Sequence, residues 1–343
     1  MPRLLKYLLN RLKFVVPQLV CVVLITFFAV RLIPGDPARI MGGPQISEEG
    51  LETLRQNMGL SGTLWEQLVR YVTNLFQGNM GTSWVTGNPV LYDIKMRLPA
   101  TLQLIIIALV ISLIVLVPLA LKSINSAKGF LGKMIKRSLS GYGMAAGAFP
   151  DFWLALILIF VFYVVLAWVP SPVGQTSMMI AMPEYITGFS LIDSVMTGNM
   201  EALKSLLAHH ILPVFVLVFV YGGGIIKIAV NAATDLHKSH FVNYLKICGA
   251  KPDIVNKYVT RASYPAISTY SAVVFGFLLG GTVLVEKVFS WGGFGQYAIQ
   301  SVVNSDFNAI QGVVLVAAVL NLVVYIVVDI ICFYVDPRIK DIG

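Results

Sequence analysis

Charged residues are scarce in this sequence. Asp, Glu, Lys and Arg make up 12% of its 343 residues, roughly half of the share that soluble domains carry, whereas hydrophobic residues make up 57%. A chain with so many apolar residues cannot bury them all in one water-surrounded core, so lipid must form part of its surroundings. The composition excludes an ordinary soluble domain and predicts an integral membrane protein.

The sequence also lacks the motifs of enzyme active sites. It contains no HExxH zinc motif, no GxSxG nucleophile motif and no GxxxxGKS/T phosphate-binding loop. Its three cysteines, Cys21, Cys248 and Cys332, form no CxxC pair and are predicted to be buried thiols. His237 and His240 lie three residues apart, but without a third ligand they favour a solvated polar face over a metal site. We therefore expect no catalytic residue, no metal and no cofactor in this chain.

Long apolar runs are the main feature that the sequence does have. The first extends from Phe14 to Val30, and five more lie near residues 100–121, 138–169, 211–230, 266–285 and 310–335. A helix needs about 20 apolar residues to cross the hydrocarbon core. Basic residues precede the first run, as in a signal peptide, but no small-residue cleavage site follows it, so we expect a retained anchor. The runs predict an all-α membrane protein with six transmembrane helices.

Lys and Arg are concentrated in the N-terminus, in residues 122–137 and 231–264, and in the C-terminal tail. These basic residues are Arg3, Lys6, Arg11, Lys13, Lys122, Lys128, Lys133, Lys136, Arg137, Lys238, Lys246, Lys251, Lys257, Arg261, Arg338 and Lys340. Because cytoplasmic loops carry an excess of basic residues, we predict cytoplasmic N- and C-termini and a large extracytoplasmic segment after the first helix. The net charge of +8 is then a property of the membrane face, and we expect no nucleic-acid partner.

This topology divides the chain into three parts. Residues 1–32 are the N-terminus and first helix, residues 33–99 the extracytoplasmic segment, and residues 100–343 the membrane core with an inner loop at 231–264. Within the second part, Ser47 followed by two glutamates predicts a helix start, and the apolar spacing over residues 64–76 predicts another helix. Residues 171–208 are predicted to be extracytoplasmic and partly amphipathic, with a re-entrant or seventh membrane element as the alternative.

The inner loop carries the clearest local pattern. Helix-compatible residues continue up to Gly249, a common helix terminator, and a predicted turn at Pro252 and Asp253 leads into a second amphipathic segment with Ile254 and Tyr258 on one face. Such a helix–turn–helix on the inner surface can dock into a cleft of a soluble partner. An ordinary basic loop at the lipid surface remains the alternative.

Motifs along nearly the whole chain resemble those of the dipeptide/oligopeptide/nickel permease family of ATP-binding-cassette (ABC) importers. The inner loop is similar to the cytoplasmic "EAA" loop of these permeases, although Lys246-Ile247-Cys248 replaces its usual acidic start. The other similar segments are Pro34-Gly35-Asp36-Pro37-Ala38, Met58-Gly59-Leu60, residues 77–83, 97–102 and 210–213, Gly280 to Glu286, Phe289 to Gly295, and Asp336-Pro337-Arg338. The stretch after Pro170 is longer than is usual in the family.

The resemblance implies a type I ABC importer permease fold in the cell membrane. The chain would form half of a translocation pathway for peptides or a related small solute, such as nickel or oligosaccharides. Its partners would be a second permease, two ATPase subunits that bind ATP and Mg, and an external substrate-binding protein. The ATPase contact would involve Gly249, Ala250, Lys251, Pro252 and Asp253. A secondary transporter or channel is the alternative, but it predicts internal repeats or midplane polar residues in several helices, and the sequence shows neither.

Small and ionisable residues inside the runs are the remaining candidates. Gly276, Gly280 and Gly281 permit close helix approach, against the partner permease or around the pore, with packing inside the chain as an equal alternative. Ionisable residues within spans mark pathways or pairings. The candidates are Asp151, Lys227, Glu286 and Asp329. For Asp329, near the cytoplasmic end of the last run, we favour a structural pairing or partner contact over a transport role.

Overall fold

The computed structural model describes residues 2–33, 36–125 and 129–335. Over these residues the chain is helical, and its only β-type pairing is an isolated bridge between Thr82 and Pro89. The C-terminal tail, including the Asp336-Pro337-Arg338 motif and Lys340, lies outside the described residues. So do Lys128 and the first two residues of the Pro34-Gly35-Asp36 motif. The predicted all-α class is confirmed for the part that is described.

Five helical segments are long and apolar enough to cross a membrane. They are α1 (Pro2–Arg31), the segment formed by α5 (Val90–Ile111), the π-helical turn η1 (Ser112–Leu116) and α6 (Val117–Asn125), then α10 (Met200–His237), α12 (Pro252–Val288) and α14 (Phe307–Val335). All five contain a predicted run, but several extend well beyond it. The predicted domain boundary after residue 99 falls inside α5, which begins at Val90.

The predicted third span, 138–169, is not one straight helix. It consists of α7 (Gly129–Ala145), the 3₁₀ turn η2 (Ala146–Ala148), α8 (Asp151–Leu158) and the π-helical segment η3 (Ile159–Val165), and the chain bends by 104° between the two halves. Phe149 is extended because it precedes a proline, and Pro150 has no N–H to continue the α7 ladder. The described residues therefore contain five candidate spans, or six if the bent pair counts as one.

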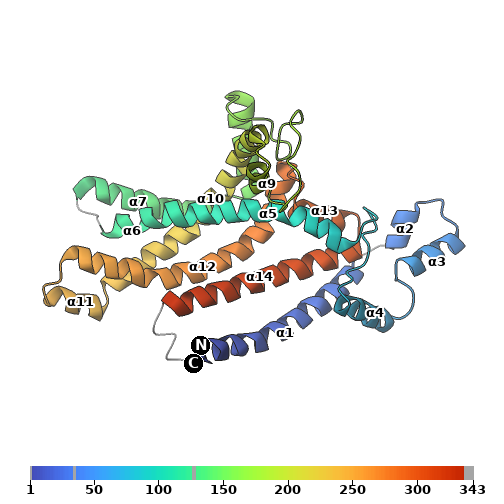
Figure 1. The fold of residues 1–343 in the computed structure, drawn as a ribbon, viewed down its shortest axis with the longest axis horizontal. Coiled ribbons are helices and arrows are strands. Elements are labelled where there is room, and N and C mark those ends of the chain that lie inside the picture. Colours follow the sequence, from blue (N-terminus) through green and yellow to red (C-terminus); the bar gives the residue numbers. More distant parts are fainter. Residues whose placement is uncertain (1, 34–35, 126–128, 336–343) are drawn as a thin grey trace.

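Helix α10 lies at the centre of the bundle. It packs against α12 and also contacts α5, α6, α7, α8 and α9. The core consists of apolar side chains of α5, α10 and α12, such as Leu104, Leu217, Ile225, Ile267 and Leu278, all of them buried. In Figure 1 these helices are roughly aligned along the long axis of the molecule. One compact set of helix–helix contacts thus holds the long helices together.

Three consecutive glycines let other elements approach α10 closely. A Cβ atom at Gly222 would meet Leu116 of η1, one at Gly223 would meet Ala146 of η2, and one at Gly224 would meet Tyr270 of α12. Small residues allow such close approach between membrane helices. The positions of η1, η2 and α12 around α10 therefore depend on this glycine run.

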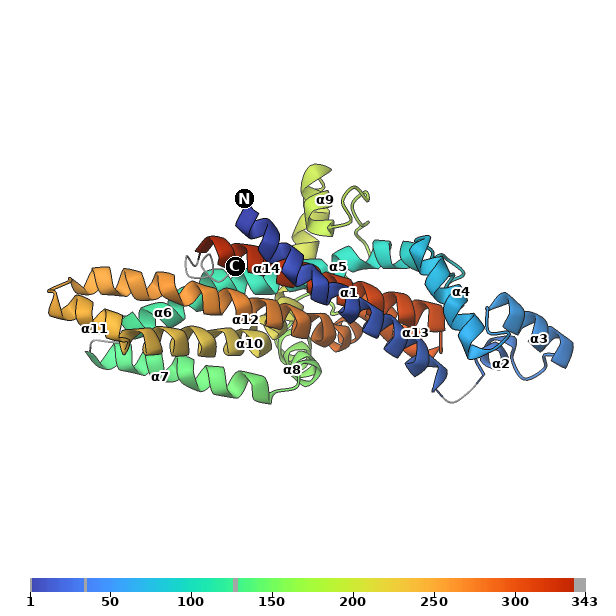
Figure 2. The same ribbon diagram turned by 90° about the horizontal axis from the view of Figure 1, so that it is seen from below.

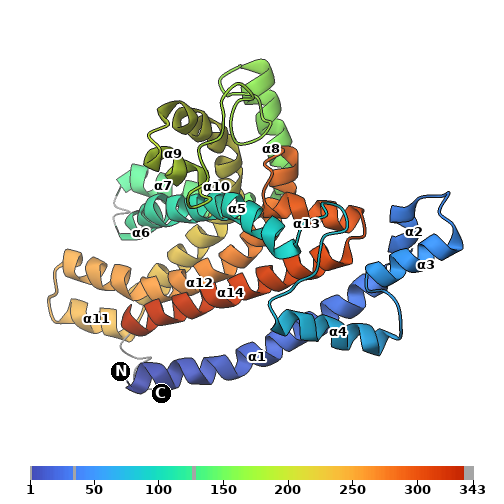
Figure 3. The ribbon, with the colours of Figure 1, turned by 45° about the vertical axis from the view of Figure 1, so that its right-hand side comes forward.

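The two ends of the long axis carry different structures. At one end, α10 and α12 are joined by the short helix α11 (His240–Ile247), and at the other lie α2 (Pro37–Gly42) and α3 (Glu48–Asn57) (Figures 1 and 2). Figure 3 shows α1 beside α14 and α4 (Leu64–Phe76) across the end of α1. Phe27 of α1 stacks on Tyr71 of α4, with ring centroids 5.9 Å apart. We call these the α11 end and the α2–α4 end.

Local sequence signals correctly predicted where the short helices α3 and α4 begin. Ser47 caps α3 by accepting a hydrogen bond from the Gly50 N–H, as its cap-and-acid pattern predicts. Thr63 and Glu66 form a reciprocal capping box at the start of α4, whose bounds agree with the predicted residues 64–76. Residues 171–208 contain an irregular stretch, α9 (Ser190–Met196) and the first turns of α10. Helix α9 is too short to span a membrane, and the start of α10 belongs to the fourth span.

Candidate functional site

The α11 hairpin (residues 239–254) connects the two central helices at one extreme of the molecule (Figure 1). Ser239 begins α11 by accepting a hydrogen bond from the Val242 N–H, 3.3 Å away. The buried side chains of Val242 in the hairpin, and of Val255 and Val259 in the turns of α12 that follow it, then anchor the hairpin to the main core. The hairpin is therefore a packed extension of the bundle rather than a loose loop.

A Schellman-type closure ends α11. The Ala250 N–H donates to the Leu245 carbonyl at 3.0 Å, and the Gly249 N–H donates to the Lys246 carbonyl at 3.1 Å. Gly249 has a φ of +76°, the left-handed conformation that this closure requires and that glycine adopts without strain. Leu245 and Ala250 both pack against the core, which is the apolar contact that accompanies this motif.

The next helix starts immediately after this closure. Lys251 is extended, and Pro252 occupies the first helical position, where the missing N–H has no consequence. Asp253 lies in the first turn, where its charge suits the helix dipole. The predicted turn at Pro252 and Asp253 is therefore wrong: these residues open α12, which continues without a break to Val288.

The five predicted docking residues lie together in this tight connection. Gly249, Lys251, Pro252 and Asp253 are exposed, and Ala250 is half-buried. Large apolar side chains around them are also exposed, namely Phe241, Tyr244, Ile247 and Ile254. Ile247 is 84% exposed, which is unfavourable in water unless another surface covers it. Chemically the hairpin tip is apolar with exposed lysines beside it, Lys246 and Lys251.

The histidines and cysteines of the sequence do not form a site. His237 ends α10 and His240 opens α11, and no group of three or more His, Cys, Asp or Glu within the described ranges could hold a metal ion. Cys332 is buried as predicted, but Cys21 and Cys248 are exposed. Cys248 is exposed because it caps the hairpin helix, and Cys21 because it faces outward from α1.

The three glycines of α12 have different surroundings. A Cβ atom at Gly276 would lie 2.7 Å from the Asn321 Oδ1 atom of α14, and one at Gly281 would overlap the Tyr221 hydroxyl and lie 2.8 Å from the Asp151 Oδ2 atom. A Cβ atom at Gly280 would meet nothing within 4 Å. Two of the glycines therefore provide space for neighbouring helices of this chain, and the third lies on an open face.

A buried polar cluster lies near the far end of α12. The Thr101 hydroxyl donates to the fully buried Glu286 carboxylate, which also accepts the Gln296 N–H at 2.9 Å. The Phe294 N–H donates to Thr101 at 2.8 Å. Two free N–H groups at the start of α13 (Phe294–Val303) are thus satisfied, one by the Thr101 hydroxyl and one by the Glu286 carboxylate. A carboxylate is a favourable group at a helix N-terminus.

Glycine is required beside this carboxylate. A Cβ atom at Gly293 would lie 2.6 Å from both the Glu286 Oε2 atom and the Thr101 hydroxyl oxygen. The sequence motifs Gly280 to Glu286 and Phe289 to Gly295 thus fold into one capping unit. Sequence reasoning singled out Glu286 but missed Thr101 as its partner, although Thr101 lies in the 97–102 motif.

Asp151 lies at the bend between α7 and α8. Its carboxylate accepts the Phe152 N–H at 2.7 Å and the Tyr221 hydroxyl at 3.0 Å. Tyr221 belongs to α10, so this contact fixes the start of α8 to the central helix. Lys227, another ionisable residue of α10, is exposed.

Comparison with known proteins relates the chain to membrane components of transport systems. Residues 4–105 match the N-terminal part of the membrane component of binding-protein-dependent transport systems, and residues 123–341 match the inner membrane component of these systems.

Individual relatives match over almost their whole length. The chain is 35% identical over 330 residues to a probable D,D-dipeptide transport system permease protein of Escherichia coli K12, and this match covers 93% of this chain and 92% of the relative. It is 32% identical over 344 residues to a di/tripeptide transport system permease protein of Pseudomonas aeruginosa, which covers 98% and 99%. It is 28% identical over 338 residues to a glutathione transport system permease protein of Salmonella paratyphi A, which also covers 98% and 99%.

Proposed function

The chain belongs to the family of inner membrane components of binding-protein-dependent transport systems, and on this premise we propose that it forms one half of the membrane pathway of an ATP-driven importer of short peptides. It is a multi-pass permease subunit of the cell membrane. The observation that carries the choice of cargo is the near full-length similarity to permeases of dipeptides, di/tripeptides and glutathione, which are all short peptides.

We infer a topology of six transmembrane helices with both termini and the α11 hairpin in the cytoplasm. The charge distribution supports it: Lys238, Lys246, Lys251 and Lys257 belong to the α11 end of the molecule, and Lys122 lies near the end of α6 that points the same way (Figure 1). The α2–α4 end carries the acids of residues 33–99 and is the proposed extracytoplasmic segment. Residues 1–32, 33–99 and 100–343 remain our division of the chain into anchor, extracytoplasmic segment and permease core.

The complex would contain this chain, a second homologous permease, two ABC ATPase subunits and an extracytoplasmic substrate-binding protein. ATP and Mg would bind to the ATPase subunits, and this chain would contribute no ATPase site and no cofactor. Residues 249–253 and the exposed apolar side chains of the α11 hairpin would fill a cleft on an ATPase subunit. Gly280, on the open face of α12, is the glycine that suits a contact with the second permease or the pore.

The geometry indicates how a motion of the ATPase subunits would be transmitted to the membrane helices. The hairpin is anchored by buried valines and is continuous with α10 and α12. A force on the hairpin therefore moves two long helices together rather than deforming a loop. An alternation of the pathway between its two faces requires this kind of collective helix motion. We find no observation that favours a secondary transporter or channel instead.

The test is a charged substitution in the hairpin. We expect Ala250→Glu to abolish the co-purification of P-loop ATPase subunits and peptide uptake, because the new carboxylate occupies a half-buried position next to the docking surface. Ala181→Glu, at an exposed position in the irregular segment, is the matched control and should retain both. The measurement is purification of the tagged chain in mild detergent, with uptake of a labelled dipeptide in cells. Normal uptake with Ala250→Glu, or a wild-type chain that never associates with ATPases, would contradict the proposal.

A further inference from the structure

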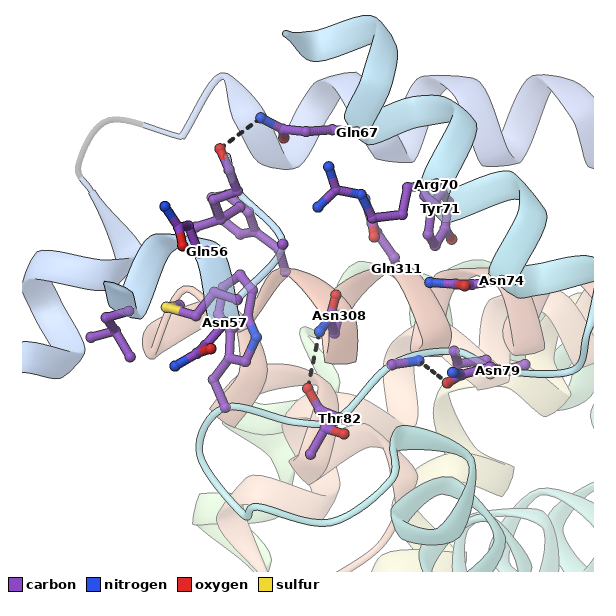
Figure 4. Close-up of a pocket in the computed structure, with 18 of the residues that line it drawn as sticks. Gln56, Asn57, Gln67, Arg70, Tyr71, Asn74, Asn79, Thr82, Asn308 and Gln311 are labelled. Carbon is purple, nitrogen blue, oxygen red and sulfur yellow. Dashed lines mark hydrogen bonds between the residues drawn. The ribbon is translucent and has the colours of Figure 1, made fainter. Parts of the chain in front are cut away.

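A pocket of about 520 Å³ lies at the α2–α4 end of the molecule. Its walls come from the ends of α1 and α3, from one face of α4, from residues 79–84 and from the first turns of α14. Figure 4 shows this arrangement, with Arg70 and Asn74 on α4 and Asn308 and Gln311 on α14. The volume lies within the range of sites that bind small ligands, about 300–1,000 Å³.

The polar side chains of the pocket share one chemical character. The lining contains two arginines, Arg31 and Arg70, and seven carboxamides, among them Asn74, Asn308 and Gln311. No carboxylate is among the described residues that line it. The pocket is therefore positively charged and rich in groups that both donate and accept hydrogen bonds. An anion that also carries amide groups matches this lining.

Gln311 provides independent evidence for a ligand. The residue is only 3% exposed, and its Nε2 atom has no hydrogen-bond partner among the described residues. Buried amide groups are normally paired, because an unpaired donor loses its hydration without compensation. Gln311 and Arg70 both line the pocket, Gln311 from α14 and Arg70 from α4 (Figure 4). A ligand acceptor would satisfy this donor.

The two arginines differ in how many of their guanidinium N–H groups are already hydrogen-bonded. Arg31 donates to the Gln67 Oε1 atom at 3.0 Å and to the Phe27 carbonyl at 3.1 Å, and it stacks on the Phe27 ring. Arg70 makes one long contact, 3.5 Å to the Ser61 carbonyl. Neither arginine forms an ion pair within the described residues. Arg70 therefore retains the planar fork of donors that binds a carboxylate in a bidentate manner.

We propose that this pocket binds the carboxylate-bearing end of a short peptide, with Arg70 on the carboxylate and Gln311, Asn308 and Asn74 on the neighbouring amide groups. The ligand chemistry follows from the lining alone, whereas its identification with a transported peptide rests on the proposed function. The site would hold a peptide at the extracytoplasmic end of this chain.

Trp84 also lines the pocket and supplies a reporter for binding. The experiment uses the full chain with its co-purifying subunits in phosphatidylcholine nanodiscs, and the probe is L-alanyl-L-alanine. We expect a saturable change in tryptophan fluorescence that is absent in Trp84→Phe. The C-terminal amide of the same dipeptide should bind at least about tenfold more weakly, because it lacks the carboxylate that Arg70 pairs with.

Two variants test the named residues. Arg70→Gln removes an exposed cation, and Gln311→Leu replaces an unpaired buried amide with an apolar group of similar size, so both variants should fold. Each should weaken dialanine binding by about tenfold or more. Arg39→Gln is the matched control, because Arg39 is exposed and outside this pocket. Its affinity should equal that of the wild type.

Equal binding of dialanine and its amide, or unchanged binding by Arg70→Gln, would overturn the proposal. So would a fluorescence response to phosphatidylglycerol without a response to dialanine, which would identify a lipid headgroup site. The two proposals can fail separately. If the chain binds dialanine but recruits no ATPase, the pocket proposal stands and the importer proposal is wrong. If cells take up the peptide but the chain does not bind dialanine, the importer proposal stands and the pocket proposal is wrong.

Discussion

At the residue scale, the three glycines of α12 differ in their surroundings. Gly276, Gly280 and Gly281 lie on one helix but face different neighbours. Sequence spacing grouped them as one set of small residues. The structure separates them, since which side of a helix meets a partner depends on how α12 is rotated in the bundle. That rotation is fixed by residues far away in the chain, such as Asn321 and Tyr221.

The first prediction concerns these glycines. We expect Gly281→Ala to destabilise the protein by about 1–3 kcal/mol, because the new methyl group would overlap the Tyr221 hydroxyl. Gly280→Ala should not lower stability, since its methyl group meets open space and alanine favours the helix by about 1 kcal/mol. The melting temperature in detergent measures both. If Gly281→Ala melted at or above the wild-type temperature, the packing described here would be wrong.

The second prediction concerns the cap of α13. We expect Glu286→Ala to lower stability by about 1–3 kcal/mol, because the Thr101 hydroxyl and the Gln296 N–H lose their buried acceptor. Thr101→Val should have a similar effect, and the double variant should lose less than the sum of the two, since both residues belong to one network. Thermal unfolding with Glu201→Ala as the exposed control gives these values. Additive losses would contradict a shared network.

The roles of some of these residues could be predicted from the sequence, and those of others could not. Gly249 was predicted as a helix terminator because the signal is local: a glycine directly after a helix-compatible stretch. The partnership of Thr101 and Glu286 joins residues 185 positions apart, and no periodicity predicts such a pair. The pocket residue Gln311 was missed for the same reason, since its significance comes from the helices that enclose it.

At the scale of single elements, hydropathy located the spans but not their ends. The predicted fifth run, 266–285, covers only the C-terminal part of α12, which begins at Pro252 and ends at Val288. Hydropathy reports where side chains contact lipid, whereas a helix continues as long as its backbone hydrogen bonds and packing allow. The short helices α3 and α4 were predicted well because capping residues mark their starts. The 104° bend at Pro150 needs tertiary packing to set its angle.

The third prediction concerns the connection between α2 and α3. The Arg55 guanidinium donates to the Asp36 carboxylate at 2.5 and 3.1 Å, and Asp36 also accepts the Ala38 N–H. Burial alone would raise the pKa of Asp36, but the hydrogen bonds from Arg55 and Ala38 lower it below its usual value of 3.8. Since the folded pKa is depressed, the stabilisation is complete above pH 3.8 and is lost as the pH falls through the lower folded value.

Hydrogen exchange of residues 37–57, corrected for the intrinsic pH dependence of amide exchange, measures this loss. We expect protection to fall below pH 3.8 in the wild type. Arg55→Gln should show weaker protection at neutral pH and a smaller change on acidification, because the main favourable partner of Asp36 is gone. Arg39→Gln removes the exposed ion pair between Arg39 of α2 and Glu48 of α3, and because such exposed pairs contribute little it should retain the wild-type pH profile. Identical profiles for all three proteins would rule out the role of the Asp36–Arg55 pair.

At the scale of the whole molecule, two helices extend from the α11 hairpin to the opposite side of the bundle. With 38 and 37 residues, α10 and α12 are each about 55 Å long at 1.5 Å per residue. The hydrocarbon core is only about 30 Å thick. A large part of each helix therefore lies outside the lipid, and the hairpin is far from the membrane centre.

The fourth prediction tests whether transport depends on this continuity. We expect an insertion of Gly-Ser-Gly after Arg261 in α12 to abolish peptide uptake while ATPase subunits still co-purify. The hairpin fold stays intact, but the flexible insertion breaks the rigid connection to the membrane part. The same insertion after Met182, in the irregular segment, should leave uptake unchanged. Uptake that survives the insertion in α12 would show that the helix does not transmit the motion.

The uninterrupted length of α12 has a mechanical consequence. The close contact of Tyr270 with Gly224 of α10 lies near the middle of α12, about 27 Å from its far end at 1.5 Å per residue. A rocking motion of about 5° around this contact moves the far end by roughly 2 Å. That far end carries Glu286, which is hydrogen-bonded to Thr101 and to the start of α13. Because this contact lies near the middle of α12, a displacement at the proposed ATPase contact would be transmitted to the other end of the helix at about the same size and in the opposite direction. The chain is in this respect a lever with two arms of similar length, and its fulcrum is the glycine-lined crossing of α10 and α12.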